Sequence, residues 1–317
     1  MAEKTKIKTS IGGSALIEGV MMRGPKTTNV AVRMSDNSIY CEEVDFKSIA
    51  GDNKFFKLPF VRGFVSLIDS MRLSMKCLTL SADKAIEGGG EEEEPSKFEK
   101  WAMEKLGDKF YNVLMAGASV LGVLLAVVLF FWVPSVIFNG IAKVAPALDK
   151  GTVWRSVLEG ILKIAIFLGY IIIVSRTPDM KRTFMYHGAE HKTIFCYENL
   201  EELTVENVRK YTRFHPRCGT SFMIIMLIVG IVIGLFITAK NPFLRAFIKI
   251  LLLPVSCGIG YELIKLCAKY DNVFTRIVAA PGLMAQRITT IEPDDSMIEV
   301  AIAAIKPVIP KNGEDRI

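Results

Sequence analysis

Four long apolar segments constrain what this chain can fold into. Each is close to the length of about 20 residues that a helix needs to cross a bilayer. The segments cover residues 111–133, 154–175, 221–238 and 247–267. With 51% hydrophobic and 23% charged residues, the chain is too apolar for an ordinary soluble domain and too charged to lie wholly within a membrane. The sequence therefore predicts a mainly α-helical, polytopic membrane protein with about four spans and polar parts outside the bilayer.

Lysine and arginine residues set the predicted orientation of these spans. They are dense before the first span, in the loop 176–220 and after the fourth span, and sparse in the two other loops. Because cytoplasmic segments near span ends are enriched in lysine and arginine, both termini and loop 176–220 are predicted to be cytoplasmic. Within the second span, Glu159 and Lys163 have the i,i+4 spacing that allows pairing on one helix face.

The segments outside the spans are predicted to form small cytosolic parts. A glycine-rich segment at 11–25 favours tight turns, and strands are indicated at 29–34 and 38–44 with a turn between them. These features predict a small α/β N-terminal subdomain. The sequence predicts that the chain is organised into five parts. They are an N-terminal subdomain at 1–58, an amphipathic interfacial helix at 59–86, an acidic linker at 87–97, the membrane bundle at 98–267, and C-terminal helices and a tail at 268–317.

Two local signals organise the C-terminal part. Pro281 and the glycine after it predict a break in the chain. Asp294 is predicted to cap a helix that ends at Ile305.

Cysteine usage and charge exclude some classes of protein. None of the six cysteines forms a CxxC pair, so free thiols in a reducing compartment are expected. The net charge of +6 comes without an RNA-recognition, zinc-knuckle or helix-turn-helix pattern. No specific nucleic-acid recognition is therefore predicted, and the lipid bilayer is the expected partner.

All three histidines fall in loop 176–220, and two of them form an H-x-x-E-H motif of His187, Glu190 and His191. On a helix, these positions share one face, so the two imidazoles can hold one zinc-like divalent ion. Such an ion lowers the pKa of a coordinated water to about 7, and Glu190 is placed to act as the general base. This is the logic of the inverted zincin motif, and it predicts a metal-dependent hydrolase.

A catalytic site needs a third protein ligand, and the sequence offers His215, Cys218 and Glu262. With Glu262 the site is the His₂Glu set of a hydrolase, whereas His215 and Cys218 together close a tetrahedron, which is typical of a structural site. An ion pair with Lys265 or a basic loop residue is the alternative for Glu262. Three further residues are candidates to line the same pocket, and plain salt bridges explain them as well: Glu18, Arg23 and Arg217.

Two other functions stay open at this stage. The first is a non-catalytic membrane factor, in which the histidines form a structural metal site or a hydrogen-bonded cluster and the cytosolic surface docks a partner such as membrane-protein insertion machinery. The second is a transporter, for which the few charges in the spans and the absence of a visible internal repeat give little support.

Four strings of the sequence together resemble the YqhQ-type family of bacterial membrane proteins: GGSALIEGVMMRGP, YHGAEHKTIFCYE, RFHPRCGTSF and PGLMAQRITTIEPDDSMIEVAIAA. The resemblance extends from about residue 11 to residue 304. That family carries a domain of unknown function and is often labelled a predicted metal-dependent enzyme, so the resemblance implies a multi-pass protein of the bacterial inner membrane. The positions that match its motifs are Glu18, Arg23, Gly24, His187, Glu190, His191, His215, Arg217 and Cys218.

Overall fold

The computed structural model describes residues 6–51, 53–87, 110–148 and 151–316. Apart from Glu87, the predicted acidic linker lies outside the described residues, as do the lysines that precede the first predicted span. Contacts divide the chain into two compact units. The sheet unit comprises Met1–Gly89, Leu168–Gly230 and Leu252–Ile317, and the helical unit comprises Gly90–Phe167 and Ile231–Leu251.

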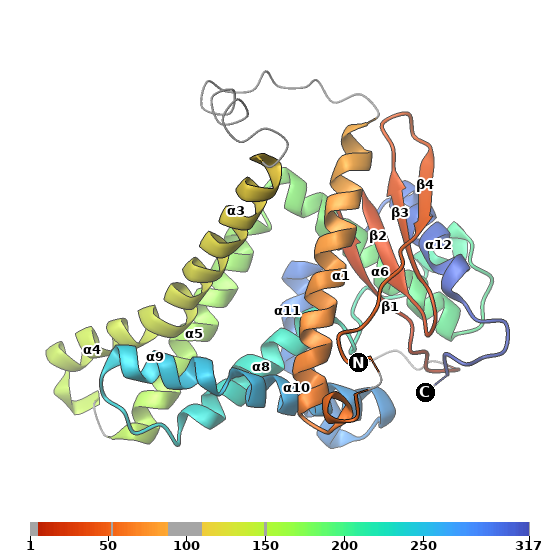
Figure 1. The fold of residues 1–317 in the computed structure, drawn as a ribbon. Helices are drawn as coiled ribbons and strands as arrows, with labels where there is room; N and C mark the ends of the chain where they lie inside the picture. The colour runs from red at the N-terminus through yellow and green to blue at the C-terminus, as the bar shows by residue number, and fades with distance from the viewer. Residues whose placement is uncertain (1–5, 52, 88–109, 149–150, 317) are drawn as a thin grey trace. The chain divides into compact units, whose positions relative to one another are not determined.

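The described chain is mainly helical, with four strands near its N-terminus (Figure 1). The strands are β1 (Gly12–Leu16), β2 (Gly19–Arg23), β3 (Thr28–Arg33) and β4 (Ile39–Glu43). The α-helices are α1 (Val61–Ile86), α3 (Phe110–Val127), α4 (Val133–Val144), α5 (Thr152–Val174), α6 (Pro178–Glu198), α7 (Val205–Arg209), α8 (Gly219–Gly234), α9 (Pro242–Leu251), α10 (Leu253–Lys269), α11 (Val273–Thr289) and α12 (Asp295–Ile305). Short 3-10 turns lie at Phe55–Lys57, Pro146–Leu148 and Lys306–Val308, and a π-helical turn at Val128–Trp132 joins α3 to α4.

The four strands of the sheet unit form an antiparallel sheet in the order β1-β2-β3-β4. The two strands predicted at 29–34 and 38–44 are β3 and β4. The glycine-rich segment, for which only tight turns were predicted, forms the β1–β2 hairpin, and Leu16 pairs with Gly19 across a turn in which Glu18 has φ 50°. Glycines lower the strand signal of a sequence, which is why this hairpin was not visible in it.

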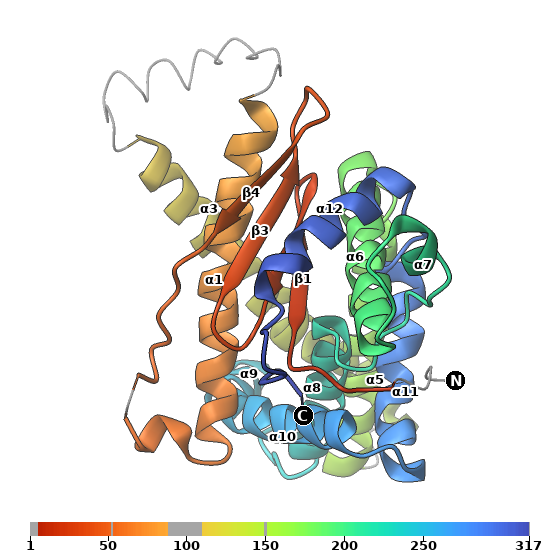
Figure 2. The ribbon, with the colours of Figure 1, turned by 90° about the vertical axis from the view of Figure 1, so that its right-hand side faces the viewer.

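Side chains alternate between the two faces of a sheet along each strand. Both faces of this sheet are buried against helices. Val20, Met22 and Ala31 pack against α6 and α12, whereas Met21 and Val30 pack against α1. Figure 2 shows α1 and α12 on opposite sides of the strands. Helices on both faces explain why β2 and β3 are nearly continuous in apolar residues rather than alternating with polar ones.

Helix α1 occupies the segment predicted as an amphipathic helix, and it packs against α10 as well as the sheet. The two helices approach closely at Gly258, where an added Cβ would lie 2.6 Å from the carbonyl oxygen of Phe60. The predicted break at Pro281 is wrong, because α11 continues through this residue. Gly282 packs so tightly on Ser221 that an added Cβ would lie 2.6 Å from its side chain, so tertiary packing holds the helix despite the proline.

Asp294 caps α12 as predicted: its carboxylate accepts from the backbone N–H of Met297 at 2.9 Å, and the helix ends at Ile305.

Within the part of the chain that the structure describes, two helices are long and apolar enough to cross a membrane, and they cover Gly117–Val144 and Thr152–Val174. A third span is present if the broken pair α9 and α10 counts as one. The predicted number of four was therefore too high. The third predicted span forms the 16-residue helix α8, which is about 24 Å long and shorter than the roughly 30 Å hydrocarbon core. The fourth is interrupted at Leu252, where Pro254 starts a new helix.

The helical unit contains a fully hydrogen-bonded buried carboxylate, Glu159. One oxygen accepts from Ser135 at 3.0 Å and from Arg155 at 2.9 Å. The other accepts from Arg245 and Lys249, each at 2.7 Å. The pairing of Glu159 with Lys163 that the spacing allowed is replaced by these partners, and the Lys163 ammonium lies 4.5 Å from the centre of the Phe131 ring.

Candidate metal centre

Helix α6 places His187 and His191 one turn apart on the same face. Thr177 before the helix has an extended backbone, and Pro178 occupies the first turn, where its fixed φ favours helix initiation. The centres of the two imidazole rings are 4.4 Å apart. The H-x-x-E-H motif therefore lies on a helix, which is the geometry that its spacing requires.

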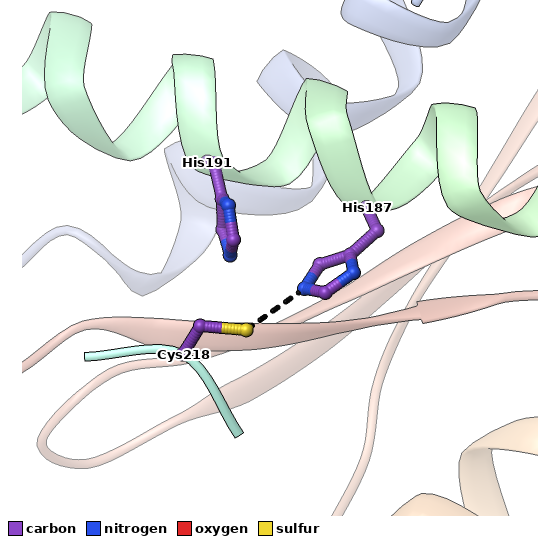
Figure 3. Close-up of side chains that lie close together, drawn as sticks. All are labelled: His187, His191 and Cys218. Carbon is purple, nitrogen blue, oxygen red and sulfur yellow. Dashed lines mark hydrogen bonds between the residues drawn. The ribbon is translucent and has the colours of Figure 1, made fainter. Parts of the chain in front are cut away.

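Cys218 brings a third donor atom to the two histidines from outside α6. It immediately precedes α8, and its Sγ lies 3.1 Å from His187 Nε2 (Figure 3). The backbone N–H of Thr220 also points at this sulfur, at 3.4 Å. Among the described residues, His187, His191 and Cys218 form a group whose donor atoms all lie within 4.8 Å of one another. Imidazole nitrogen and thiolate sulfur are the donors that zinc prefers.

The hydrogen bonds of the two imidazoles prepare them for metal binding. Nδ1 of His187 lies 2.8 Å from the carbonyl oxygen of Thr289, and Nδ1 of His191 lies 2.5 Å from that of Arg213. Because a carbonyl can only accept, each Nδ1 carries its hydrogen and leaves the lone pair of a neutral ring on Nε2. A backbone carbonyl on the far nitrogen is the usual second contact of metal-bound histidines.

Two buried polar atoms of this site have no hydrogen-bond partner among the described residues. They are Nε2 of His191 and Oε2 of Glu190. The two side chains belong to residues that are 1% and 4% exposed, and an unsatisfied buried polar group costs about 1–3 kcal/mol. A cation held between the three donors satisfies His191, and a water beside it satisfies Glu190. The residues present therefore fit a divalent metal.

Burial and mutual electrostatic interactions shift the pKa values of Cys218, His187 and Glu190. Burial alone would raise the pKa of the Cys218 thiol, but His187 and His191 hold it well below its usual value. Burial likewise lowers the pKa of His187, and the Cys218 thiolate more than reverses this, giving a pKa of about 9. Burial raises the pKa of Glu190 above its usual value, although both imidazoles oppose the shift. A raised pKa suits a carboxylate that exchanges protons near neutral pH.

The three donors face a cavity of about 740 Å³ within the sheet unit. Its walls are β1, α1, α6 and the segment around Cys218, and it is lined by many hydroxyl groups as well as by Glu190. This volume lies within the range of small-molecule sites, about 300–1,000 Å³. The three donor residues therefore border a cavity of the size that small-molecule sites have.

A close contact at Gly188 fixes one of the carbonyl groups that orient the histidines. An added Cβ at Gly188 would lie 2.1 Å from the carbonyl oxygen of Ile291. The backbone N–H of Ile291 also donates to the carbonyl of Phe184 at 2.9 Å. The segment after α11 thus lies directly on α6, which brings the Thr289 carbonyl to His187.

His215 lies beside the metal donors but is used differently. Its ring centre is 5.4 Å from that of His191, and its Nδ1 accepts from the backbone N–H of Arg217 at 3.3 Å. Its Nε2 lies 3.2 Å from Nη2 of Arg217 and 3.9 Å from a carboxylate oxygen of Glu198. Burial lowers the pKa of His215 to about 4, even though Glu198 opposes the shift.

The remaining candidates from the sequence have separate positions. Glu262 is outside the three-residue group, and both of its oxygens accept from Arg62, at 2.7 and 2.6 Å, rather than from Lys265 or a loop residue. Glu18 forms a bidentate ion pair with Arg182 at the β1–β2 turn. Arg23 and Arg217 both line the cavity.

Comparison with known proteins shows the family. Residues 58–311 match the family described as "Protein of unknown function (DUF1385)". The chain is also 33% identical over 307 residues to "Uncharacterized protein YqhQ" of Bacillus subtilis (strain 168), covering 96% of this chain and 94% of the relative. This chain belongs to the DUF1385 family. The match confirms the resemblance seen in the four sequence strings, and no solved structure matches.

Two residues of this DUF1385 protein support the centre without having been identified from its sequence. Glu198 accepts from the backbone N–H of Thr9 at 2.8 Å and pairs with Arg217. It is seven residues after His191 on α6, so helical spacing was a usable signal. Gln286 holds the backbone of His215 through two bonds of 2.8 and 2.7 Å, and no local pattern marks it. The description of the family names no function.

Proposed function

We propose that this chain is a membrane-associated, metal-dependent hydrolase whose zinc-like ion is bound by His187, His191 and Cys218. The observation that carries the proposal is the convergence of three donor atoms within 4.8 Å. Both histidines are already oriented by carbonyl groups on Nδ1. Three protein ligands and an open fourth position are typical of catalytic zinc sites, whereas structural sites are closed by four.

A bound divalent metal supplies a Lewis acid that polarises the substrate carbonyl or phosphoryl group and makes water nucleophilic at neutral pH. Glu190 is the general base. Its free oxygen is buried beside the donors, and it takes a proton from the attacking water and passes it to the leaving group. Cys218 binds as the thiolate, which the two imidazoles favour over the thiol. His215 and Glu198 hold the surrounding segment rather than the ion.

A rival function is favoured by the 3.1 Å contact between His187 Nε2 and Cys218 Sγ. In a metal-free cluster, His187 and Cys218 satisfy each other's hydrogen-bonding capacity. The chain would then be a non-catalytic membrane factor that docks a partner, such as membrane-protein insertion machinery. This alternative leaves the buried Nε2 of His191 without a purpose. The metal centre accounts for both histidines and for the cavity, and for that reason we favour it.

We propose that the chain is located in the bacterial inner membrane. Of the described helices, two, or three if the broken pair is one span, have the length and composition to cross it. The basic residues of 176–220 favour a cytoplasmic position for the metal centre by the positive-inside rule.

The decisive test is metal analysis of protein purified in mild detergent without chelators. We expect about one zinc per chain in the native protein and loss of most of it in His191→Ala and Cys218→Ala, since each removes a donor. Cys257→Ala is the matched control, because Cys257 is a buried free thiol outside the group.

Cobalt substitution then tests whether a coordination position is open. A thiolate-to-cobalt band reports Cys218, and azide should change the visible bands if it can enter the fourth position. If the protein binds one cobalt ion per chain and azide does not change the visible spectrum, the catalytic role is contradicted. If the native protein contains no metal, the hydrogen-bonded cluster is the better explanation.

A further inference from the structure

The cavity beside the metal donors contains the free edge of a β-sheet. Strand β1 is at one end of the four-stranded order, so it has a strand partner on one side only. Gly12, Gly13, Ser14 and Ala15 of this strand all line the cavity. An edge strand presents backbone N–H and C=O groups that can pair with another extended chain.

The hydrogen-bond pattern of the sheet identifies which backbone groups of β1 point outward, away from β2. The N–H of Arg33 donates to the carbonyl of Glu18, which makes Gly19 and Val32 a non-hydrogen-bonded pair of the β2–β3 ladder. Because the pattern alternates, Met21 directs its backbone groups toward β1 and binds Ser14, its partner in register. Gly13 and Ala15 therefore direct their N–H and C=O groups away from the sheet.

One of these outward groups already contacts the proposed catalytic base. The backbone N–H of Gly13 faces the carboxylate of Glu190 and helps to lower its pKa against the effect of burial. An added Cβ on Gly13 would lie 3.0 Å from the Glu190 side chain, so the strand edge and the base are in direct contact. The carbonyl of Gly13 and both backbone groups of Ala15 are directed away from β2 as well, and the Ala15 carbonyl accepts from the Ser14 hydroxyl at 3.4 Å.

We propose that the substrate is an extended polypeptide that binds as an additional strand on β1, with its scissile bond at the metal centre. This inference rests on the proposed hydrolase function and specifies its substrate class. Adding a strand to a sheet edge is a common way of binding peptides, in which backbone pairing provides affinity. Across the cavity, the wall from α1 presents Ser66, Ser70 and Ser74, which are spaced i,i+4 along one helix face.

The lining of the cavity disfavours the other substrate classes. Phosphoesters are usually held by free arginines, but Arg217 is committed to Glu198 and to the Thr9 carbonyl, and the Arg23 guanidinium lies over the Phe46 ring. An acyl chain requires an apolar channel, whereas serine and threonine hydroxyl groups line much of this cavity. Hydroxyl groups and a strand edge suit a backbone rich in amides.

The reaction is hydrolysis, and its atoms balance with water alone. The oxygen of water bonds to the carbonyl carbon of the scissile amide, and Glu190 accepts the proton released from that water. The C–N bond then breaks, and Glu190 returns the proton to the leaving nitrogen. The second proton of the water passes from the new carboxyl group to the new amine, so the products are one carboxylate and one ammonium group, and no oxidant or other reactant is needed.

The first experiment uses the full-length, zinc-loaded protein in detergent with peptides from a digest of casein, an unstructured protein. Mass spectrometry identifies new cleavage sites, and the Glu190→Gln variant is the blank. For the best-cleaved peptide, a scan of single N-methyl groups replaces each backbone N–H in turn. Strand pairing predicts that alternate positions lose about tenfold or more in kcat/KM while the positions between them change little, since only every second N–H faces β1.

A matched pair of proline variants tests the strand from the protein side. Ala15→Pro removes an N–H that points to the free edge of β1. Cys41→Pro does the same on β4, the opposite edge strand, where Cys41 is exposed and pairs with Ala31 in a non-hydrogen-bonded position. We expect Ala15→Pro to reduce peptide cleavage about tenfold or more and Cys41→Pro to leave it unchanged.

The possible failures are distinguishable. Cleavage of casein peptides without alternation in the N-methyl scan, or equal effects of the two proline variants, would overturn strand pairing and leave the hydrolase intact. Zinc- and Glu190-dependent hydrolysis of p-nitrophenyl phosphate or of phosphatidylglycerol vesicles, with no peptide cleaved, would overturn the substrate class alone. A protein without zinc or any hydrolysis would overturn both proposals.

Discussion

Glu159 in the helical unit and Glu190 in the sheet unit are both buried glutamates, and they are satisfied in opposite ways. Glu159 is 1% exposed and accepts four hydrogen bonds, three of them from arginine or lysine. Glu190 is 4% exposed and leaves one oxygen without a partner among the described residues. A buried carboxylate is costly unless it is paired, so the first is complete as it stands and the second is arranged for something that binds.

The neighbours of the two carboxylates reinforce this contrast. Three cationic side chains and the Ser135 hydroxyl donate to Glu159, and both of its oxygens accept hydrogen bonds. Around Glu190 are two imidazoles and a thiol whose donor atoms converge, a cavity and the backbone N–H of Gly13. The difference indicates that burial alone does not mark a functional carboxylate. Incomplete hydrogen bonding beside a cavity is the more informative property.

Glutamate-to-glutamine substitution should have unrelated effects at the two sites, and the largest expected effect is a loss of catalytic rate. Glu190→Gln keeps the shape of the side chain but removes the base, so we expect casein-peptide hydrolysis to fall about 10²- to 10⁴-fold with zinc content unchanged. Single-turnover cleavage and metal analysis on the same sample check this. Full activity in the variant would show that Glu190 is a packing residue, like its counterpart in the helical unit.

Glu159→Gln should instead reduce stability. Removing this charge leaves Arg155, Arg245 and Lys249 without their shared counter-ion, and breaking a buried pair costs about 3–5 kcal/mol. Unfolding in mixed detergent and sodium dodecyl sulfate measures the change in free energy. Glu190→Gln is the matched control and should be as stable as the native protein. Equal destabilisation of the two variants would remove the contrast.

Gly188→Ala sharpens the comparison by acting on metal binding without touching a donor. The new methyl group would meet the carbonyl of Ile291 and displace the segment that holds the Thr289 carbonyl on His187. Loss of such an outer contact typically lowers metal affinity about 10- to 100-fold, which competition with a zinc-sensitive dye can measure. Gly230→Ala, on a helix with open space around this glycine, should have no effect. An unchanged affinity in Gly188→Ala would show that the Thr289 contact is dispensable.

The smallest predicted effect is a pH dependence that only the metal centre should show. With its pKa raised to about 9 by the Cys218 thiolate, His187 carries a proton below that pH in the metal-free protein. Zinc needs the bare Nε2, so binding must release this proton. Zinc affinity should therefore rise about tenfold per pH unit and level off near pH 9. Calorimetry in buffers of different ionisation enthalpy counts the protons, and zero released protons would contradict the thiolate–imidazolium pair.

Periodicity and spacing predicted much of the fold. The apolar segments gave a mainly helical, membrane-associated chain, and two short strands flanking a turn were predicted close to the observed bounds of β3 and β4. The errors have physical causes. Gly12, Gly13 and Gly19 hid the β1–β2 hairpin, Pro281 is accommodated because its helix packs on Ser221, and Pro254 divides a segment that hydropathy treats as continuous.

For the metal centre, the sequence by itself determined that His187, Glu190 and His191 share a helix face, because their spacing matches the helical repeat. It named Cys218, His215 and Glu262 as equal candidates for the third ligand. Only the tertiary structure placed Cys218 against His187, turned His215 toward Arg217 and paired Glu262 with Arg62. These contacts join residues that are far apart in the chain. They depend on how helices and strands pack, which local spacing does not encode.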